Sequence, residues 1–137
     1  MSSFKIFDIA GSGMNAQNLR MNIVASNLAN VDAVSSSLDQ TYRARQPVFQ
    51  AMLDQANLRN PAVGVRMAGV VESEAPLVRE YAPHHALADD EGYIYRPNVS
   101  VVEEMANMIS ASRAYQNNVE VVNATRQMMS ATINLGR

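Results

Sequence analysis

Proline is confined to the middle of this chain, and its distribution limits where long helices can form. All five prolines lie between positions 47 and 97 of the 137 residues, so 1–46 and 98–137 contain none. Because proline removes a backbone donor and breaks helix interiors, long helices are allowed only at the two ends. Charged residues are also concentrated in the middle. The sequence therefore divides into 1–31, 32–97 and 98–137.

The first of these segments predicts an amphipathic helix from about Ile6 to Asn30. One apolar stripe at helical spacing consists of Met14, Gln17, Met21, Val24, Leu28 and Val31. A second stripe consists of Ile9, Gly13, Ala16, Leu19 and Ile23. Two stripes on one helix imply that a single neighbour cannot cover it. Because glycine is a poor helix former, we expect a break near Gly11-Ser12-Gly13.

The last segment predicts one helix of about 35 residues that ends at Leu135 before Gly136. Ser100 and Glu103 have the spacing of a capping box, in which the serine oxygen accepts from the Glu103 amide and the Glu103 side chain reaches back. At 1.5 Å per residue the helix would span about 50 Å. Its apolar stripe approaches a heptad repeat. The predicted stripe is Met105, Ile109, Ser112, Tyr115, Val119, Val122, Arg126, Met129 and Ile133.

The middle segment predicts loops and short strands. Alternation and β-branched residues in 42–50 and 63–71 predict a hairpin, and 89–92 predicts a turn before a short strand at 93–95. We expect a mainly α protein with a small β part. Its terminal helices would pair as an antiparallel, coiled-coil-like unit beside this hairpin and loop region.

Composition and spacing argue against several kinds of chemistry. The chain has no cysteine, which excludes disulfides and thiolate metal sites, and its net charge of −2 without a basic tract favours neither nucleic acid nor an anionic membrane. Adjacent histidines at 84 and 85 point to opposite sides of an extended chain. The acidic run at 89–91 lacks the ligand spacing of a calcium loop. We therefore expect no metal, no cofactor and no catalytic residues.

Glu103 and Glu104 could suggest a pair of acid and base carboxylates. Neighbouring helix positions diverge by about 100°, so the pair is better suited to capping the helix and to a favourable charge at its N-terminus. Asn27 and Asn123 leave two interpretations open. They are either exposed to solvent or buried between helices, where they would fix the register by hydrogen bonding.

Short motifs at both ends resemble those of flagellar rod and hook proteins. The N-terminal motifs are Ser12-Gly13-Met14-Asn15-Ala16-Gln17, Arg20-Met21 and Ala25-Ser26-Asn27-Leu28-Ala29-Asn30. The C-terminal motifs are Glu104-Met105-Ala106-Asn107-Met108-Ile109 and Ser112-Arg113-Ala114-Tyr115-Gln116. The short length, Gly92-Tyr93 and the run from Pro97 to Met105 resemble the proximal-rod members. The likeness is close over 1–31 and 92–137 and looser between them.

The resemblance implies a structural subunit of the proximal rod of the bacterial flagellar basal body. It implies that such subunits polymerise, transmit torque and line the export channel with their terminal helices. Implied partners are other copies of the chain, other rod proteins and the junction of the MS ring and export gate at the rod base. The implied location is the rod in the periplasm. The resemblance also implies type III export, and the lack of a signal-peptide pattern in 1–8 agrees with export without a cleaved signal.

The stripes and motifs together predict an assembly interface on the two terminal helices. Asn27, Leu28 and Asn30 would join the first helix to the second near 105–115. The predicted interface residues are Met14, Arg20, Met21, Ile23, Val24, Asn27, Leu28, Asn30, Met105, Met108, Ile109, Ser112, Arg113, Tyr115, Val119, Val122, Asn123, Met129 and Ile133. The alternative from another class is a self-contained helical adaptor or regulatory binding module.

Overall fold

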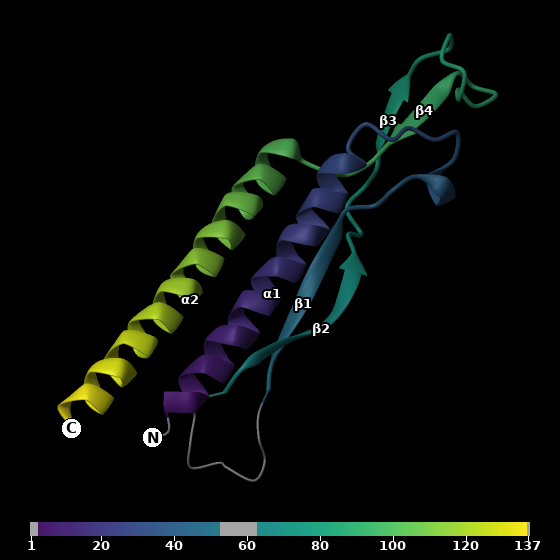
Figure 1. The fold of residues 1–137 in the computed structure, drawn as a ribbon. Coiled ribbons are helices and arrows are strands. Elements are labelled where there is room, and N and C mark those ends of the chain that lie inside the picture. Colours follow the sequence, from purple (N-terminus) through teal and green to yellow (C-terminus); the bar gives the residue numbers. More distant parts are fainter. Residues whose placement is uncertain (1–2, 53–62, 137) are drawn as a thin grey trace.

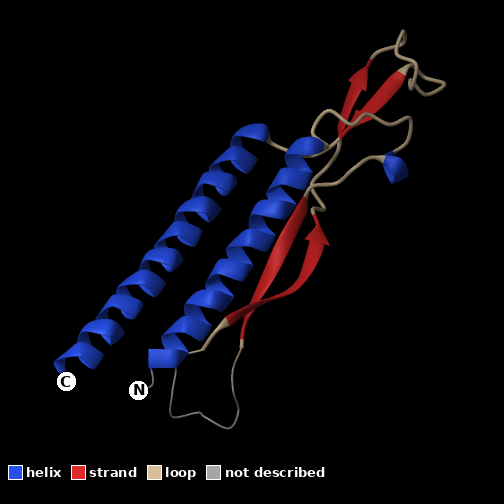
Figure 2. Ribbon diagram, viewed as in Figure 1, coloured by secondary structure: helices blue, strands red, loops and turns tan. Residues whose placement is uncertain are grey.

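Two long helices and a β-hairpin lie side by side along one axis (Figure 1). The computed structural model describes residues 3–52 and 63–136. Helix α1 (Ser3–Ala29) lies in the middle and contacts helix α2 (Val101–Leu135) as well as strands β1 (Arg45–Ala51) and β2 (Val65–Glu72). The helices run antiparallel, so both chain ends lie at one end of the molecule. The predicted mainly α fold with a small β part is confirmed (Figure 2).

Helix α1 runs without interruption through Gly11-Ser12-Gly13, so the predicted break is wrong. Two of these small residues, Gly13 and Ser12, make contacts with the two neighbours of α1, which are α2 and the β1–β2 hairpin. A Cβ built on Gly13 would lie 3.0 Å from Asn118 Nδ2 on α2, so glycine lets the two helices approach closely. On the hairpin side, Ser12 Oγ accepts from the Val65 amide at 3.1 Å. The helix is retained because tertiary packing outweighs the weak helix propensity of glycine.

Gly11 and Gly13 form a matched pair for testing this explanation. A Cβ at Gly11 meets nothing within 4 Å, so Gly11→Ala is expected to raise the free energy of unfolding by about 0.5–1 kcal/mol. Gly13→Val is expected to lower it by about 1–3 kcal/mol, because the added side chain meets Asn118. Urea denaturation of both purified variants measures the difference. Equal effects of the two substitutions would contradict the close approach at Gly13.

Helix α2 has the predicted length, and Ser100 is its N-cap, with Oγ accepting from the Glu103 amide at 3.4 Å. The row of residues that packs on α1 differs from the predicted stripe. We call it the packing row, and its members are Glu104, Met108, Ala111, Tyr115, Asn118, Val122, Thr125 and Met129. Only Tyr115, Val122 and Met129 belong to both. The predicted members Met105, Ile109, Arg126 and Ile133 are exposed.

The difference has a physical reason in the size of the buried side chains. One heptad position of the packing row holds Glu104, Ala111, Asn118 and Thr125, which are small or polar. Ala111 is 0% exposed, and small residues at such positions allow the helices to approach each other. A prediction from hydrophobicity alone selects larger residues next to these positions in the sequence. The predicted stripe therefore has the correct helical period but is rotated about the helix axis relative to the packing row.

The predicted hairpin is confirmed as the antiparallel pair of β1 and β2. The register pairs Arg45 with Glu72 and Ala51 with Val65, with an irregularity between Val48 and Phe49. The tip of the hairpin, 53–62, lies outside the described residues. Because β1 and β2 both contact α1, this hairpin is the second neighbour that the two stripes of α1 require.

A second hairpin lies beyond the end of the helices that is farther from the two chain termini (Figure 1). Only its second strand was predicted from the sequence. This hairpin pairs β3 (Val78–Tyr81) with β4 (Tyr93–Arg96), and a 3-10 turn (Leu38–Gln40) precedes β1 in the chain. The predicted turn before β4 is confirmed, with Gly92 at φ 81°. Asp89 Oδ1 accepts from the amides of Tyr93 and Glu91 at 2.8 and 3.0 Å. These bonds, the Tyr93 bond first, lower the pKa of Asp89.

Candidate functional site: an assembly interface

Helix α1 is covered on two sides within its own chain. Leu19 and Ile23 line a depression with Met67 and Val70 of β2, while Val24 is buried beside α2. The row that stays exposed is Asn15, Asn18, Asn22, Ala25 and Ala29. Most of this row is asparagine, so α1 offers little apolar surface to further partners beyond its first turn, where Phe4 and Ile6 are exposed.

Asn27 is the polar centre of the contact between α1 and β1. Its side chain is 1% exposed and satisfies both backbone groups of Arg45. Asn27 Nδ2 donates to Arg45 O at 2.9 Å, and the Arg45 amide donates to Asn27 Oδ1 at 2.9 Å. Tyr42 Oη also donates to Asn27 Oδ1, at 2.8 Å. Asn27 is therefore buried, as one of the two interpretations held, but it joins α1 to β1 and not to α2.

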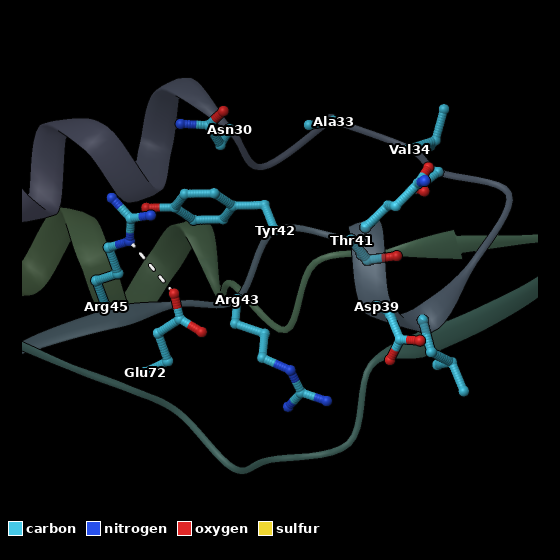
Figure 3. A pocket seen from close by; sticks show the side chains of 12 residues that line it. Asn30, Ala33, Val34, Asp39, Thr41, Tyr42, Arg43, Arg45 and Glu72 are labelled. Atoms are coloured by element: carbon cyan, nitrogen blue, oxygen red, sulfur yellow. Dashed lines mark ion pairs between the residues drawn. The ribbon is translucent and has the colours of Figure 1, made fainter.

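Tyr42 and Arg45, the partners of Asn27, line a polar groove of about 560 Å³ between the end of α1 and the start of β1 (Figure 3). The Arg45 guanidinium lies 5.4 Å from the centre of the Tyr42 ring, and Arg45 Nε lies 3.8 Å from Glu72 Oε1. Both members of this ion pair are about half exposed, so it contributes little stability. The groove is a consequence of how β1 is held on α1.

Asn98 fixes the segment that leads into α2, and no role was predicted for it beyond its place in a family motif. Its Oδ1 accepts from the Ala44 amide at 2.8 Å, and its Nδ2 donates to Ala75 O at 2.8 Å. A single amide thus connects the segments on either side of the β1–β2 hairpin with the start of α2. Asparagine followed by a helix cap is the only local signal for this role.

The polar contacts between the two helices involve one predicted residue, Arg20, and two that were not predicted, Asn107 and Asn118. Arg20 Nη2 donates to Asn107 Oδ1 at 3.0 Å, and Asn118 lies against Gly13. Asn30 bonds within its own helix, to Ser26 O, and Asn123 is exposed. Within this chain the side chains of Asn27 and Asn30 therefore bond to Arg45 and Ser26 and not to α2, and a role for Asn27, Leu28 and Asn30 in joining terminal helices stays a prediction. Arg20 is the predicted interface residue that does bridge the helices.

The surface of α2 outside the packing row, its outer face, carries two groups of exposed apolar residues on opposite flanks of the helix. The amino-terminal patch consists of Val102, Met105 and Ile109. The carboxy-terminal stripe consists of Val121, Ala124, Met128, Ala131 and Leu135. Alternating steps of three and four place each group along one side of the helix. Leu135 is 87% exposed and Met128 61%, and α1 is the main element that packs on α2.

The predicted interface residues fall into two sets in the structure. One set is buried or half-buried within the chain: Met14, Arg20, Met21, Ile23, Val24, Asn27, Leu28, Asn30, Met108, Ser112, Tyr115, Val119, Val122 and Met129. The other set is exposed on α2: Met105, Ile109, Arg113, Asn123 and Ile133. The carboxy-terminal stripe was missed, although its spacing of three and four is visible in the sequence.

No group of three or more histidine, aspartate or glutamate side chains in 3–52 and 63–136 is placed to hold a metal ion. No helix in that part of the chain combines the length and apolar character needed to cross a membrane.

Family models of flagellar rod proteins match both ends of the chain. The family described as "Flagella basal body rod protein" matches residues 7–35. The family described as "Flagellar basal body rod FlgEFG protein C-terminal" matches residues 90–135. These segments contain α1 and α2 and agree with the motifs recognised in the sequence.

Full-length relatives carry the name flagellar basal-body rod protein FlgC. The protein from Salmonella typhimurium strain LT2 is 49% identical and that from Escherichia coli O157:H7 is 50% identical, each over the whole of both chains. The more distant one from Borreliella burgdorferi is 32% identical over 97% of each chain. These identities leave no basis for the adaptor alternative. The chain belongs to the FlgC family of flagellar basal-body rod proteins, and it is a structural rod subunit of the basal body, not an enzyme.

Proposed function

We propose that this chain is a subunit of the proximal rod, in which α1 and α2 form an inner layer around the export channel. Residues 1–31 and 98–137 would belong to this layer, and 32–97 would make outer contacts. The subunit would bind other copies of itself, other rod proteins and the junction of the MS ring and export gate. In the periplasm it would transmit torque along the rod.

The observation that carries the proposal is the apolar outer face of α2. Helix α2 packs on α1 along one side and exposes the amino-terminal patch on one of the remaining flanks and the carboxy-terminal stripe on the other. A helix that is apolar on both sides requires a second packing partner. No element in the described part of the chain covers the second side, so neighbouring axial subunits are the expected cover.

The expected strength of this contact follows from the exposed side chains. Burying a Val, Leu or Met side chain contributes about 1.5–3 kcal/mol when it is fully removed from water. The three large members of the carboxy-terminal stripe would thus contribute several kcal/mol to each contact, before the entropy cost of association. A rod subunit meets several neighbours, so moderate contacts of this kind add up to a stiff assembly.

Deletion of residues 126–137 tests the proposal. The shortened chain lacks most of the carboxy-terminal stripe, and we expect it to be produced at the normal level but to abolish rod assembly. The measurement is motility in soft agar of a strain that lacks the chromosomal gene, with isolated basal bodies inspected for rods. Normal motility of the strain that carries only the shortened chain would contradict the proposal.

A further inference from the structure

A groove runs beside the amino-terminal half of α2, between that helix and β1. Its floor is α1, which contributes Arg20 and Val24. Pro47 and Phe49 of β1 form one wall, and Glu104 of α2 lies in the other. The groove has a volume of about 370 Å³ and is open to solvent, and Phe49 is 37% exposed in it. The site thus combines an apolar wall with a carboxylate.

Glu104 lacks a hydrogen-bond donor for one of its oxygens. The residue is 9% exposed, and its Oε2 is buried without a partner in the described part of the chain. The two arginines in the groove are directed elsewhere, because Arg20 donates to Asn107 and Arg45 approaches Glu72. A buried acceptor without a donor costs about 1–3 kcal/mol, and more when it is charged. The Glu104 carboxylate therefore lacks a donor from the described part of its own chain, and the groove that Glu104 lines is the side from which a donor can approach it.

Arg113 on the outer face of α2 has the matching properties. It is exposed, and the ion pairs among the described residues involve Arg45, Arg79 and Arg96 but not Arg113. It follows Ile109 of the amino-terminal patch by one helical turn, so a guanidinium and an apolar surface are presented together. The patch suits Phe49 and Pro47, and the guanidinium suits the Glu104 carboxylate.

We propose that Arg113 of one copy enters the groove of a second copy and donates to Glu104 Oε2, with the amino-terminal patch packed on Phe49. This inference rests on the proposed function and names the contact that joins successive copies. Arg113 lies nine residues after Glu104, which places the two side chains on opposite sides of α2, about 180° apart. A contact between two different surfaces repeats from copy to copy without closing on itself, as a rod requires.

Charge reversal tests the pairing in a strain that lacks the chromosomal gene. Glu104→Arg and Arg113→Glu are each expected to reduce the swarm ring to that of the empty-vector strain. The double variant, with both charges exchanged, is expected to recover at least half of the wild-type diameter. Glu74→Arg is the control, because Glu74 is also an exposed glutamate but lies outside the groove and outside α2, and it should behave as wild type. Single reversals that swim normally, or a double variant that recovers nothing, would overturn the pairing.

The same strain separates failure of the inference from failure of the proposed function. If the unmodified chain restores motility and the single reversals do too, the rod assignment stands and the Arg113–Glu104 contact is wrong. If the unmodified chain does not restore motility, the proposed function fails, and the inference that rests on it fails as well.

Engineered cysteines provide a readout that does not depend on exchanging charges. The chain contains no cysteine, so every disulfide in the variant Phe49→Cys with Ile109→Cys is defined. Oxidation of isolated basal bodies should give a ladder of covalent multimers. The control variant, Phe49→Cys with Gln127→Cys, should give none, because Gln127 lies outside the proposed contact. Absence of multimers in motile cells that carry the first variant would contradict the proposed geometry.

Discussion

Replacing Asn27 with alanine is expected to lower the free energy of unfolding by about 3 kcal/mol. The side chain is 1% exposed and bonds to the amide and the carbonyl of Arg45 as well as to the Tyr42 hydroxyl. Alanine leaves the amide and the carbonyl of Arg45 without the partner that Asn27 provides. The Tyr42 hydroxyl keeps Ser26 Oγ, at 3.3 Å, as a second partner, which limits the loss.

Urea denaturation of the purified chain measures this effect, and Asn22→Ala is the matched control. Asn22 is an exposed asparagine on the same helix, so its replacement should change stability by no more than about 0.5 kcal/mol. Asn27→Asp is the complementary variant, because it keeps the acceptor oxygen but loses the donor to Arg45 O. Equal stabilities for Asn27→Ala and Asn22→Ala would contradict the central role of this side chain.

Asn27 also shows what sequence reasoning could and could not predict about the site. Its position in an apolar helix made burial one of two open interpretations, and the structure selects that one. Its partners at 42 and 45 were not predicted, because only the fold brings the start of β1 back along α1. The stripes of α1 indicated that two neighbours were needed, without indicating that the hairpin is one of them.

The elements that were predicted correctly are those with strong local signals. The prolines delimited both helices, and alternation with β-branched residues located β1 and β2. Strand β3 was missed because all four of its residues are exposed, so it has no apolar alternation to detect. It is held by pairing with β4, and nothing near 78–81 in the sequence reveals that contact.

The phase of α2 was predicted less well than its length, for a reason that bears on function. This helix carries apolar residues on both sides, and the larger ones face away from α1. A search for one hydrophobic face therefore mixed members of the packing row with members of the outer face. The predicted stripe therefore combined residues that pack on α1 with residues that are exposed and available to neighbouring subunits.

Replacing Met128 on the outer face of α2 with glutamate is expected to abolish motility. Met128 is 61% exposed in the middle of the carboxy-terminal stripe, so the substitution should leave the helical content of the purified chain unchanged. In an assembled rod the new carboxylate would be buried against a neighbouring subunit without a partner. The cost of burying an unpaired charge, several kcal/mol in each contact, would be repeated in every copy of the subunit.

Two control variants separate the apolar contact from other effects of this substitution. Met128→Leu keeps an apolar side chain of similar volume and should swim as wild type. Gln127→Glu adds the same charge one position away, outside the stripe, and should retain most of the swarm diameter. The swarm diameter of each strain and circular dichroism of each purified chain provide the two readouts. If Met128→Glu and Gln127→Glu reduced motility equally, added charge would explain the defect and the carboxy-terminal stripe would have no special role in assembly.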